Sequence, residues 1–260
     1  MVSDTPLGSR NHRWKKAWVI GASSGIGEEL ALQLSDVSQD VIISARREDK
    51  LAEIADHADN ISAIAFDIND YDRVDAIFEA MLQEDNLPDL VVICSGVWNP
   101  VKLPDLPVDA FRYGMETNYI SVVKILSHLV PAMQAKGTGH IGLVASVAGY
   151  RGMPNAGAYA PTKAALINLA ECLRPQLNKM GITLSLINPG FVETPMTSVN
   201  KFPMPFLMKP KDAAAEIVKG LLKKRYEIAF PLRLVLILKF ARAMPNELYF
   251  WMVRKFMLKR

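Results

Sequence analysis

The sequence is poor in cysteine and histidine. Its two cysteines, Cys94 and Cys172, both fall inside elements predicted to be core, which is no disulfide framework and is typical of a reducing compartment. The four histidines show no metal-ligand spacing, either among themselves or with the cysteines. We therefore expect no metal site.

Long apolar runs and a large net charge are also absent. The longest runs, Leu234–Leu238 and Leu248–Val253, are far shorter than the roughly 18 apolar residues of a membrane-spanning helix. The polar N-terminus, Met1 to Lys16, lacks the apolar segment of a secretory signal. The net charge of +3 argues against general nucleic-acid binding. We expect a cytoplasmic protein that begins with a flexible arm over residues 1–15.

Apolar runs of strand length alternate with helical patterns along the 260 residues, which indicates a parallel sheet covered by helices. The sequence therefore predicts an α/β fold, a Rossmann-like doubly wound parallel sheet of about seven strands with helices on both faces, as a single domain over residues 16–230. The predicted strands are Ala17–Ile20, Asp40–Ser44, Ile61–Phe66, Leu90–Cys94, His140–Ala145, Ile182–Ile187 and Glu227–Ala229. The predicted helices are Gly25–Leu34, Asp49–Ala58, Tyr71–Gln83, Val108–Ala135 (broken near Asn118), Ala158–Asn178 and Asp212–Lys223.

Ser146, Tyr159 and Lys163 have the spacing of a hydride-transfer site. Tyr159 and Lys163 lie four residues apart, so on a helix they share one face. A lysine ammonium there would lower the pKa of the phenol from its usual value of about 10, so that the phenol could exchange a proton near neutral pH. Ser146 would hydrogen-bond the same reacting oxygen. Alone, the Tyr-x-x-x-Lys pattern is also that of a surface helix, but the serine and a glycine motif favour the catalytic interpretation.

A glycine-rich turn follows the first predicted strand and begins the first helix. Its sequence is Gly21-Ala-Ser-Ser-Gly25-Ile-Gly27, which differs from the commoner Gly-x-Gly-x-x-Gly spacing. Such a turn lets the backbone approach a pyrophosphate, whose charge the helix N-terminus attracts. The residues of this turn that we expect to bind a dinucleotide are Gly21, Ser23, Ser24, Gly25, Ile26 and Gly27.

With these motifs the chain resembles the short-chain dehydrogenase/reductase (SDR) family over roughly Lys16 to Ala229. The resemblance implies that Tyr159 exchanges a proton with the substrate oxygen and that Ser146 positions this oxygen. Lys163 is implied to bind the nicotinamide ribose and to lower the pKa of Tyr159. Asn118 matches the family's helix-break asparagine, which is implied to hold a water of the proton relay.

The same resemblance implies where the other cofactor contacts lie. Asp67 and Ile68, after the third strand, match the position that contacts adenine, and the segment 188–194 is implied to cradle the nicotinamide. Considered alone, Asn118 could be an ordinary helix cap and this segment an ordinary turn. The remaining implied contacts are Ser95, Gly96, Pro189, Gly190, Val192 and Thr194.

The end of the second strand favours NADP over NAD. An acidic residue about 20 positions beyond the glycines binds the ribose hydroxyls of NAD, whereas arginine accommodates the 2′-phosphate of NADP. Arg46 and Arg47 occupy this strand end, and no Asp or Glu does. The guanidinium fork suits phosphate geometry, so NADP (NADPH) is the expected cofactor and NAD the alternative.

Two positions depart from the family pattern. The family usually has threonine before the first glycine and Asn-Asn-Ala-Gly after the fourth strand, whereas this chain has Ile20 and Ile93-Cys-Ser-Gly96. The family's polar groups there are implied to hydrogen-bond each other across the sheet. Because the loss of both partners of a buried hydrogen bond can be nearly neutral, we expect the cofactor site to survive.

Residues 191–211 correspond to the segment that folds over the substrate in this family. Its apolar side chains favour an apolar alcohol or ketone as substrate, or they pack as the core of a rigid loop. These side chains are Met196, Phe202, Met204, Phe206, Leu207 and Met208.

Residues 231–260 form a basic and apolar C-terminal extension. Residues 223–260 carry ten Lys/Arg and two Asp/Glu, a net charge of +8, so the rest of the chain carries −5. The extension could form an interfacial helix on a membrane surface, or it could cap the substrate pocket or contact another subunit. Trp251 interrupts the charged sector, and Pro231 and Pro245 divide the segment, which favours the cap or contact.

Together these motifs predict an NADP-dependent oxidoreductase that interconverts a carbonyl and an alcohol on an apolar small molecule, as a homodimer or homotetramer through the two long helices. One alternative is a membrane-surface SDR that acts on lipid, steroid or retinoid-like substrates. Another is an NADP-binding protein without turnover, which the filled catalytic positions disfavour. Length and glycine spacing disfavour the sugar epimerases and dehydratases of the longer-chain branch.

Overall fold

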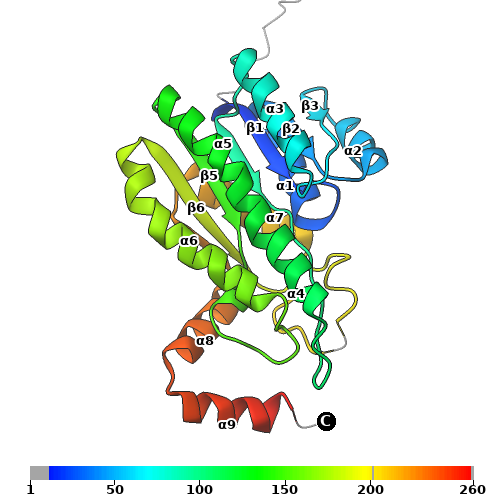
Figure 1. Ribbon diagram of the computed structural model, residues 1–260, viewed down its shortest axis with the longest axis vertical. Coiled ribbons are helices and arrows are strands. Elements are labelled where there is room, and N and C mark those ends of the chain that lie inside the picture. Colours follow the sequence, from blue (N-terminus) through cyan, green and yellow to red (C-terminus); the bar gives the residue numbers. More distant parts are fainter. Residues whose placement is uncertain (1–11, 201, 259–260) are drawn as a thin grey trace, which may run out of the picture.

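The computed structural model describes residues 12–200 and 202–258 (Figure 1). Its centre is a parallel seven-stranded sheet with the order β3-β2-β1-β4-β5-β6-β7, which confirms the predicted doubly wound sheet. Strand order reverses between β1 and β4, and folds of this type bind ligands outside the carboxyl ends of the strands at such a point. The strands are β1 (Trp14–Ile20), β2 (Ser38–Ser44), β3 (Ile61–Ala63), β4 (Leu90–Ile93), β5 (Gly139–Val144), β6 (Ile182–Pro189) and β7 (Glu227–Phe230).

Helices cover both faces of the sheet. One face packs on α1, α2 and α7, and the other packs on α3, α5 and α6. Because both faces are buried, the strands are apolar on both sides; in β1, Val19 belongs to the first core and Trp18 to the second. The helices are α1 (Gly25–Ser35), α2 (Glu48–Ala55), α3 (Tyr71–Gln83), α4 (Val108–Met115), α5 (Ser121–Lys136), α6 (Ala160–Lys179), α7 (Pro210–Leu222), α8 (Leu232–Ala243) and α9 (Asn246–Phe256).

The predicted break near Asn118 is a π-helical turn, η1 (Glu116–Ile120), between α4 and α5. A π-turn widens the helix by one residue and is common at functional sites. Here it places Asn118, which is fully buried, on the side of the helix that meets the chain after β4.

Several boundaries differ from the prediction. The sheet begins at Trp14, inside the expected arm, because this ring is buried and the Arg13 N–H donates to the Val37 carbonyl at 2.8 Å. Residues 1–11 of that arm lie outside the described residues. Strand β3 ends at Ala63, three residues early. The expectation that Cys172 is core is wrong, because this side chain lies on the exposed face of α6.

The C-terminal extension forms α8 and α9, which lie at the lower end of the molecule in Figure 1. Pro231 and Pro245 directly precede the two helices, so the prolines divide the extension as the sequence indicates. One face of α8 packs on the sheet through Leu234 and Val235, and α9 projects beyond it.

Candidate active site

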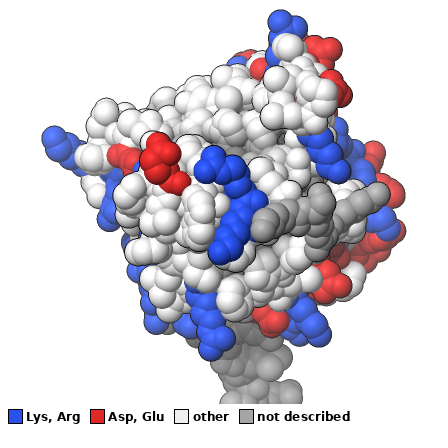
Figure 2. Space-filling model, turned by 90° about the horizontal axis from the view of Figure 1, so that it is seen from below, with Lys and Arg blue, Asp and Glu red and all other residues white. Residues whose placement is uncertain are grey.

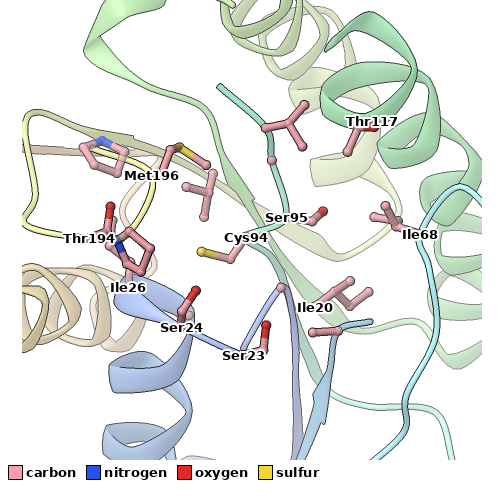
Figure 3. Close-up of a pocket in the computed structure, with 18 of the residues that line it drawn as sticks. Ile20, Ser23, Ser24, Ile26, Ile68, Cys94, Ser95, Thr117, Thr194 and Met196 are labelled. Atoms are coloured by element: carbon pink, nitrogen blue, oxygen red, sulfur yellow. The ribbon is translucent and has the colours of Figure 1, made fainter. Parts of the chain in front are cut away.

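A cavity of about 310 Å³ opens at the carboxyl ends of the central strands (Figure 3). Cofactor and catalytic residues expected from the sequence line it from β1, β2, β4, β5, β6 and α6. Those that line the cavity are Gly21, Ser23, Ser24, Ile26, Gly27, Arg46, Arg47, Asp67, Ile68, Ser95, Gly96, Ser146, Tyr159, Lys163, Pro189, Gly190, Val192 and Thr194.

Two expected residues, Gly25 and Asn118, lie behind the cavity wall. Gly25 has a φ of +62°, and a Cβ there would lie 2.7 Å from Cγ2 of Thr194. Asn118 lies behind Gly96, where an added Cβ would be 3.3 Å from its Oδ1. Gly25 and Asn118 therefore act on the cavity indirectly, because Gly25 lies against Thr194 and Asn118 lies against Gly96, and both of those residues line it.

The glycine turn brings backbone rather than side chains to the cavity. Gly21 has a φ of +95°, and a Cβ there would lie 2.5 Å from the Ser95 nitrogen. A Cβ on Gly27 would lie 2.1 Å from the Gly21 carbonyl oxygen. Only glycine fits these two positions, and the helix α1 that follows directs its N-terminus to the cavity.

Ser146, Tyr159 and Lys163 reach the cavity from two neighbouring segments. Ser146 begins the 3-10 turn η2 (Val147–Gly149) after β5, and its Oγ accepts from the Ala148 N–H at 3.1 Å. Tyr159 directly precedes α6, and Lys163 lies in the first turn of that helix. The Lys163 Nζ donates to the Val144 carbonyl at 2.9 Å and lies 5.7 Å from the centre of the Tyr159 ring.

The pKa values of this pair are set mainly by burial. Burial raises the pKa of Tyr159 to about 12, although the Ser146 hydroxyl acts in the opposite direction. Burial also lowers the pKa of Lys163 to about 8. The expected lowering of the Tyr159 pKa by Lys163 is therefore wrong for these contacts, because the ammonium binds the Val144 carbonyl and burial disfavours a tyrosinate.

Asn118 joins the helix break to the chain after β4. Its Oδ1 accepts from the Val97 N–H at 2.7 Å, and its Nδ2 donates to the Val97 carbonyl at 3.0 Å. The same Nδ2 lies 3.1 Å from Oγ1 of Thr162, in the first turn of α6. Asn118 thus fixes the position of the segment that carries Ser95 and Gly96.

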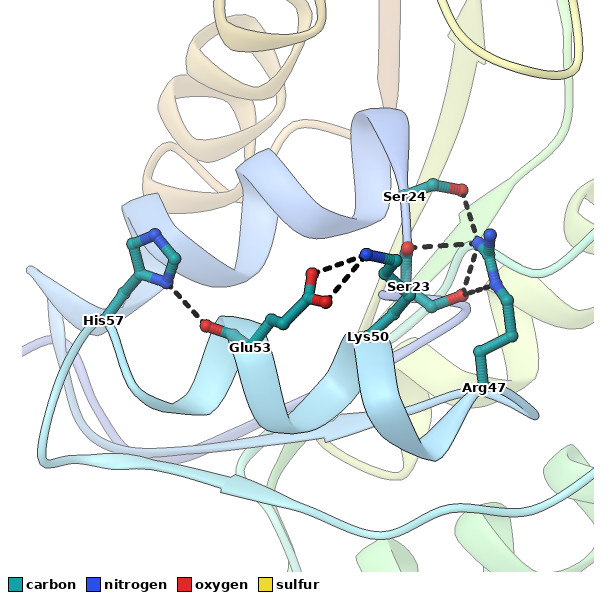
Figure 4. Close-up of polar contacts among 6 residues, drawn as sticks. All are labelled: Ser23, Ser24, Arg47, Lys50, Glu53 and His57. Carbon is teal, nitrogen blue, oxygen red and sulfur yellow. Dashed lines mark hydrogen bonds and ion pairs between the residues drawn. The ribbon is translucent and has the colours of Figure 1, made fainter.

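The two arginines after β2 have different contacts. Arg47 donates to the Ser23 Oγ at 2.8 Å, to the Ser23 carbonyl at 3.0 Å and to the Ser24 Oγ at 3.0 Å (Figure 4). Arg46 lies at the open rim, where its Nη1 is 3.8 Å from Oδ2 of Asp67. The guanidinium groups therefore lie beside the glycine turn and beside the expected adenine position.

The residues that depart from the family pattern form an apolar contact. Ile20 and Ile93 are register partners in β1 and β4, and both are buried. Because both side chains are apolar, neither leaves a buried polar group of the other without a hydrogen bond, as we expected from the sequence. Cys94 lines the cavity, and burial raises the pKa of its thiol to about 11. The Ser95 Oγ is buried and has no hydrogen-bond partner within the described chain.

Sequence reasoning missed Trp98 and Thr117. The Trp98 ring packs edge-on against Tyr159 with 5.2 Å between ring centres, and its Nε1 donates to Oδ1 of Asn200 at 3.0 Å. Thr117 lines the cavity and accepts from the Asn69 side chain at 2.9 Å. An aromatic residue two positions after Gly96 was the available signal for Trp98, whereas no spacing rule points to Thr117.

The fold defines a class of protein, a Rossmann-type doubly wound α/β fold, and the cavity lies at the switch point of its sheet, where folds of this class bind ligands. A family model described as short chain dehydrogenase matches residues 15–202. An uncharacterized oxidoreductase of Myxococcus xanthus is 34% identical over 91% of this chain and 95% of its own, and one of Staphylococcus haemolyticus is 30% identical over 79% and 90%. A solved short-chain dehydrogenase from Streptomyces avermitilis has a TM-score of 0.79 at 22% identity and covers 92% of this chain and 96% of its own.

The chain belongs to the short-chain dehydrogenase/reductase family. It is an oxidoreductase, and its cofactor is a nicotinamide dinucleotide, NAD or NADP. Within residues 12–200 and 202–258, no three histidine, cysteine or acidic side chains gather where they could hold a metal ion. No described helix combines the length and the apolar character needed to cross a membrane.

Proposed function

We propose that this protein is an NADP-dependent oxidoreductase that interconverts a carbonyl and an alcohol on an apolar small molecule. The observation that carries the proposal is the position of Ser146, Tyr159 and Lys163 in one wall of the cavity that the glycine turn opens. A surface helix would leave Lys163 in solvent, but here Lys163 is buried. Burial of an ammonium is costly, so its presence in the cavity favours a chemical role.

The cavity suits a dinucleotide on three independent grounds. The glycine turn presents backbone where a Cβ would collide with Ser95 or Gly21. The Ser95 Oγ is a buried polar atom without a partner in the described chain, so a polar ligand group would satisfy it. The arginines at the end of β2 supply positive charge. Gly21 and Gly27 would hold the pyrophosphate, Arg46 and Arg47 would lie at the adenosine ribose, and Val192 and Thr194 would hold the nicotinamide.

The bound cofactor supplies the hydride, and the residues of the chain supply the proton. Tyr159 donates its proton to the developing alkoxide during reduction and accepts it back during oxidation. The hydroxyl of Ser146 hydrogen-bonds the same oxygen. Lys163, whose ammonium donates to the Val144 carbonyl beside the cavity, would bind the nicotinamide ribose. Asn118 holds the chain beside Lys163 and would hold a water, and this water would return the proton to Tyr159.

The two arginines after β2 support NADP rather than NAD as the cofactor. Both arginines line the cavity after β2, and Nη1 of Arg46 lies 3.8 Å from Oδ2 of Asp67, at the position expected to contact adenine. A ribose 2′-phosphate there would form charge-assisted hydrogen bonds with Arg46 and Arg47, worth about 1.5–3 kcal/mol each. NADH lacks the 2′-phosphate that these two arginines would bind.

Apolar groups beside Tyr159 support an apolar substrate. Trp98 packs on the Tyr159 ring, and Met196 of the substrate loop lines the cavity. The Phe202 ring packs on Phe191 of the same loop with 6.0 Å between ring centres. A ketone or aldehyde with an apolar body would fill this side of the cavity, with its oxygen at Ser146 and Tyr159.

The assembly and location that we propose are a cytoplasmic homodimer or homotetramer through the two long helical segments, α4–α5 and α6. Ile120 and Val123 support this assembly, since they are apolar and exposed on that side of the molecule.

Two measurements test the function. A panel of ketones and aldehydes is assayed by NADPH absorbance. Turnover of apolar members supports the proposal, and cofactor binding without turnover of any member supports a non-catalytic protein.

In the second measurement, NADPH and NADH are titrated by fluorescence into the wild type and into Arg46→Ala and Arg47→Ala. We expect each variant to lose roughly 10–100-fold in NADPH affinity with little change for NADH. Equal affinities in the wild type contradict the NADP assignment; Arg73→Ala, an exposed arginine on α3, is the control.

A further inference from the structure

The outer face of α8 is apolar and uncovered by the described chain. Leu232, Leu236 and Phe240 follow one another at a spacing of four residues, so they share one side of the helix. They are 66%, 58% and 69% exposed. The opposite side of α8 is buried against the sheet through Leu234 and Val235. The helix therefore buries one apolar side and leaves a second one outside.

The helix α9, which follows α8, also exposes apolar side chains. Trp251 and Phe256 are 47% and 68% exposed, and Lys255 lies 4.8 Å from the centre of the Trp251 ring. The helix is nevertheless held in place, because the Tyr249 hydroxyl donates to the Gly152 carbonyl at 2.5 Å. Its aromatic side chains are therefore exposed in a fixed position.

Two loops bring more apolar side chains to the same end of the molecule. Figure 1 shows the segment before α4 and the substrate loop before α7 in the lower half of the molecule, above α9 in that view. Leu103 and Leu106 of the first loop are 79% and 56% exposed, and Val199 of the substrate loop is 56% exposed. We call the outer side of α8 and α9, with these two loops, the apolar end.

The apolar end is also basic. The described residues 231–258 contain five Lys/Arg, of which Lys239 pairs with Glu227, and one acidic residue, Glu247. Figure 2, seen from this end, shows a mostly uncharged surface interrupted by Lys and Arg groups and by fewer acidic ones. A second copy of the chain on this face would bring like charges together, whereas anionic headgroups would complement them.

We propose that the apolar end docks the protein on the surface of a membrane that contains anionic lipid. The exposed Leu, Phe and Trp side chains enter the boundary between headgroups and acyl chains, and the basic residues of α8 and α9 contact the phosphates. The substrate loop, whose Met196 lines the cavity, then faces the bilayer. This surface goes beyond the proposed reaction, since it assigns the place where an apolar substrate would reach the site.

The test uses the full-length protein and vesicles without cofactor or substrate, so its outcome is independent of turnover. Sedimentation is measured with phosphatidylcholine vesicles that contain about 30% phosphatidylserine, and with pure phosphatidylcholine. We expect binding to the anionic vesicles at about 0.05 M salt and at least a tenfold loss at about 0.5 M, because salt screens exposed charges. A protein that stays in the supernatant with anionic vesicles at low salt overturns the proposal.

Two double variants locate the surface. Arg254→Glu with Lys255→Glu should weaken binding to anionic vesicles by at least about 30-fold, since each basic residue near such a surface contributes roughly 1 kcal/mol. Its control is Lys223→Glu with Lys224→Glu, which makes the same charge change before β7, at the other end of that strand. An equal loss in both variants would indicate a dependence on total charge and overturn the location.

Leu236→Ser with Phe240→Ser should also weaken vesicle binding by at least tenfold, because it removes two exposed apolar groups. Its control is Leu82→Ser with Leu222→Ser, which removes exposed leucines of α3 and α7. Light scattering of the same proteins distinguishes the other occupant of this face. If the α8 variant loses an oligomer and keeps its vesicle binding, the surface joins two copies of the chain and the proposal is wrong.

Discussion

Burial of the Tyr159 hydroxyl favours one direction of the reaction and disfavours the other. Burial raises the pKa of Tyr159 to about 12, so the phenol holds its proton at neutral pH and can serve as an acid during carbonyl reduction. In the alcohol-oxidation direction the same burial is a disadvantage. We therefore expect reduction to remain efficient at neutral pH and oxidation to accelerate toward alkaline pH.

The first prediction concerns the removal of that hydroxyl. Tyr159→Phe should lower kcat by about 10²–10⁴-fold, because it removes the proton donor and keeps the ring. NADPH affinity, measured by fluorescence, should remain nearly unchanged. The control is Tyr226→Phe, which removes a buried hydroxyl without a partner in the described chain and should retain full activity. A Tyr159→Phe enzyme with most of its rate would exclude the role that we assign.

The second prediction concerns His140, a buried imidazole in β5. Its Nε2 lies 2.9 Å from the Ser185 Oγ, which itself donates to the Arg225 carbonyl at 2.6 Å, so Nε2 carries the proton and Nδ1 has no partner in the described chain. Burial, with the charges of Lys224 and Arg13, lowers the pKa of His140 to about 4. Between about pH 6.5 and 4, His140 is therefore protonated in the unfolded chain and neutral in the folded chain.

The free energy of unfolding should consequently fall by about 3 kcal/mol from this residue as the pH falls from 7 to 4. Stability from His140 is fully present above about pH 6.5 and is lost below it. Urea unfolding at several pH values measures this slope. His140→Gln should flatten the slope, whereas His57→Gln, at an exposed position after α2, should leave it unchanged. An unchanged slope in His140→Gln would contradict the assignment.

The site residues that could be predicted from the sequence are those that belong to motifs of fixed spacing. The glycine turn, Ser146, Tyr159 and Lys163 line one cavity, as their spacing predicts. The pKa of Tyr159 could not be predicted, because it depends on burial and on the choice of the Val144 carbonyl by Lys163. The hydrogen bond of Trp98 to Asn200 could not be predicted either, since the two residues lie 102 positions apart in sequence.

At the scale of the elements, apolar periodicity predicted every strand and most helix boundaries within a few residues. One difference of three residues is at β3, where the chain after Ala63 continues beside β2 through the Ile64 and Phe66 N–H groups but leaves the ladder. The start of β1 at Trp14 depends on a tertiary contact with Val37, which periodicity does not reveal. The residue at which a strand begins or ends therefore depends on single backbone contacts of this kind.

The third prediction concerns the substrate loop. Trp98 connects Tyr159 to this loop through its ring packing and its hydrogen bond to Asn200. Trp98→Ala should lower kcat/KM for apolar substrates by about 10–100-fold, mainly through KM, because it removes the apolar ring beside Tyr159 and the hydrogen bond to the substrate loop while Tyr159 remains. Steady-state kinetics on a series of ketones of increasing length measures this effect.

Two further variants separate the ring from the hydrogen bond. Trp98→Phe keeps an aromatic ring and loses the N–H donor, so it should match Asn200→Ala and lose roughly tenfold or less. The double variant should then equal either single variant. Additive losses would show that Trp98 and Asn200 act separately, and a Trp98→Ala enzyme with unchanged KM would show that Trp98 does not contact substrate.

At the scale of the whole molecule, alternation of strands and helices was sufficient to predict the sheet and its switch point, because parallel strands need helical crossovers. The placement of α8 and α9 was not accessible in this way. Composition indicated only that the extension is basic and apolar. Whether its apolar side chains are inside or outside depends on how much of the sheet edge remains to be covered after β7, and only one side of α8 finds such a surface.

Glu227 joins this extension to the active-site side of the sheet. Its carboxylate binds Lys239 of α8, accepts from the Tyr150 hydroxyl at 2.5 Å and accepts from the Asn188 Nδ2 at 3.2 Å. Tyr150 follows the turn that begins at Ser146, and Asn188 precedes the segment expected to hold the nicotinamide. Burial raises the pKa of Glu227, but the hydrogen bonds from Lys239 and Tyr150 outweigh it and hold the pKa below its usual range.

The last prediction is that Glu227→Gln loosens the extension and the site together. The carboxylate should contribute about 1–3 kcal/mol to the free energy of unfolding above its unfolded pKa, near 4.5, and this contribution should disappear as the pH falls through its lower folded pKa. Urea unfolding of wild type and variant should therefore differ at pH 7 and converge toward pH 3. Proteolysis between β7 and α8 should also accelerate in Glu227→Gln. Glu216→Gln, which removes an exposed ion pair on α7, is the control and should alter neither measurement. A Glu227→Gln protein that is as stable as wild type at pH 7 would show that α8 is held by its apolar side alone.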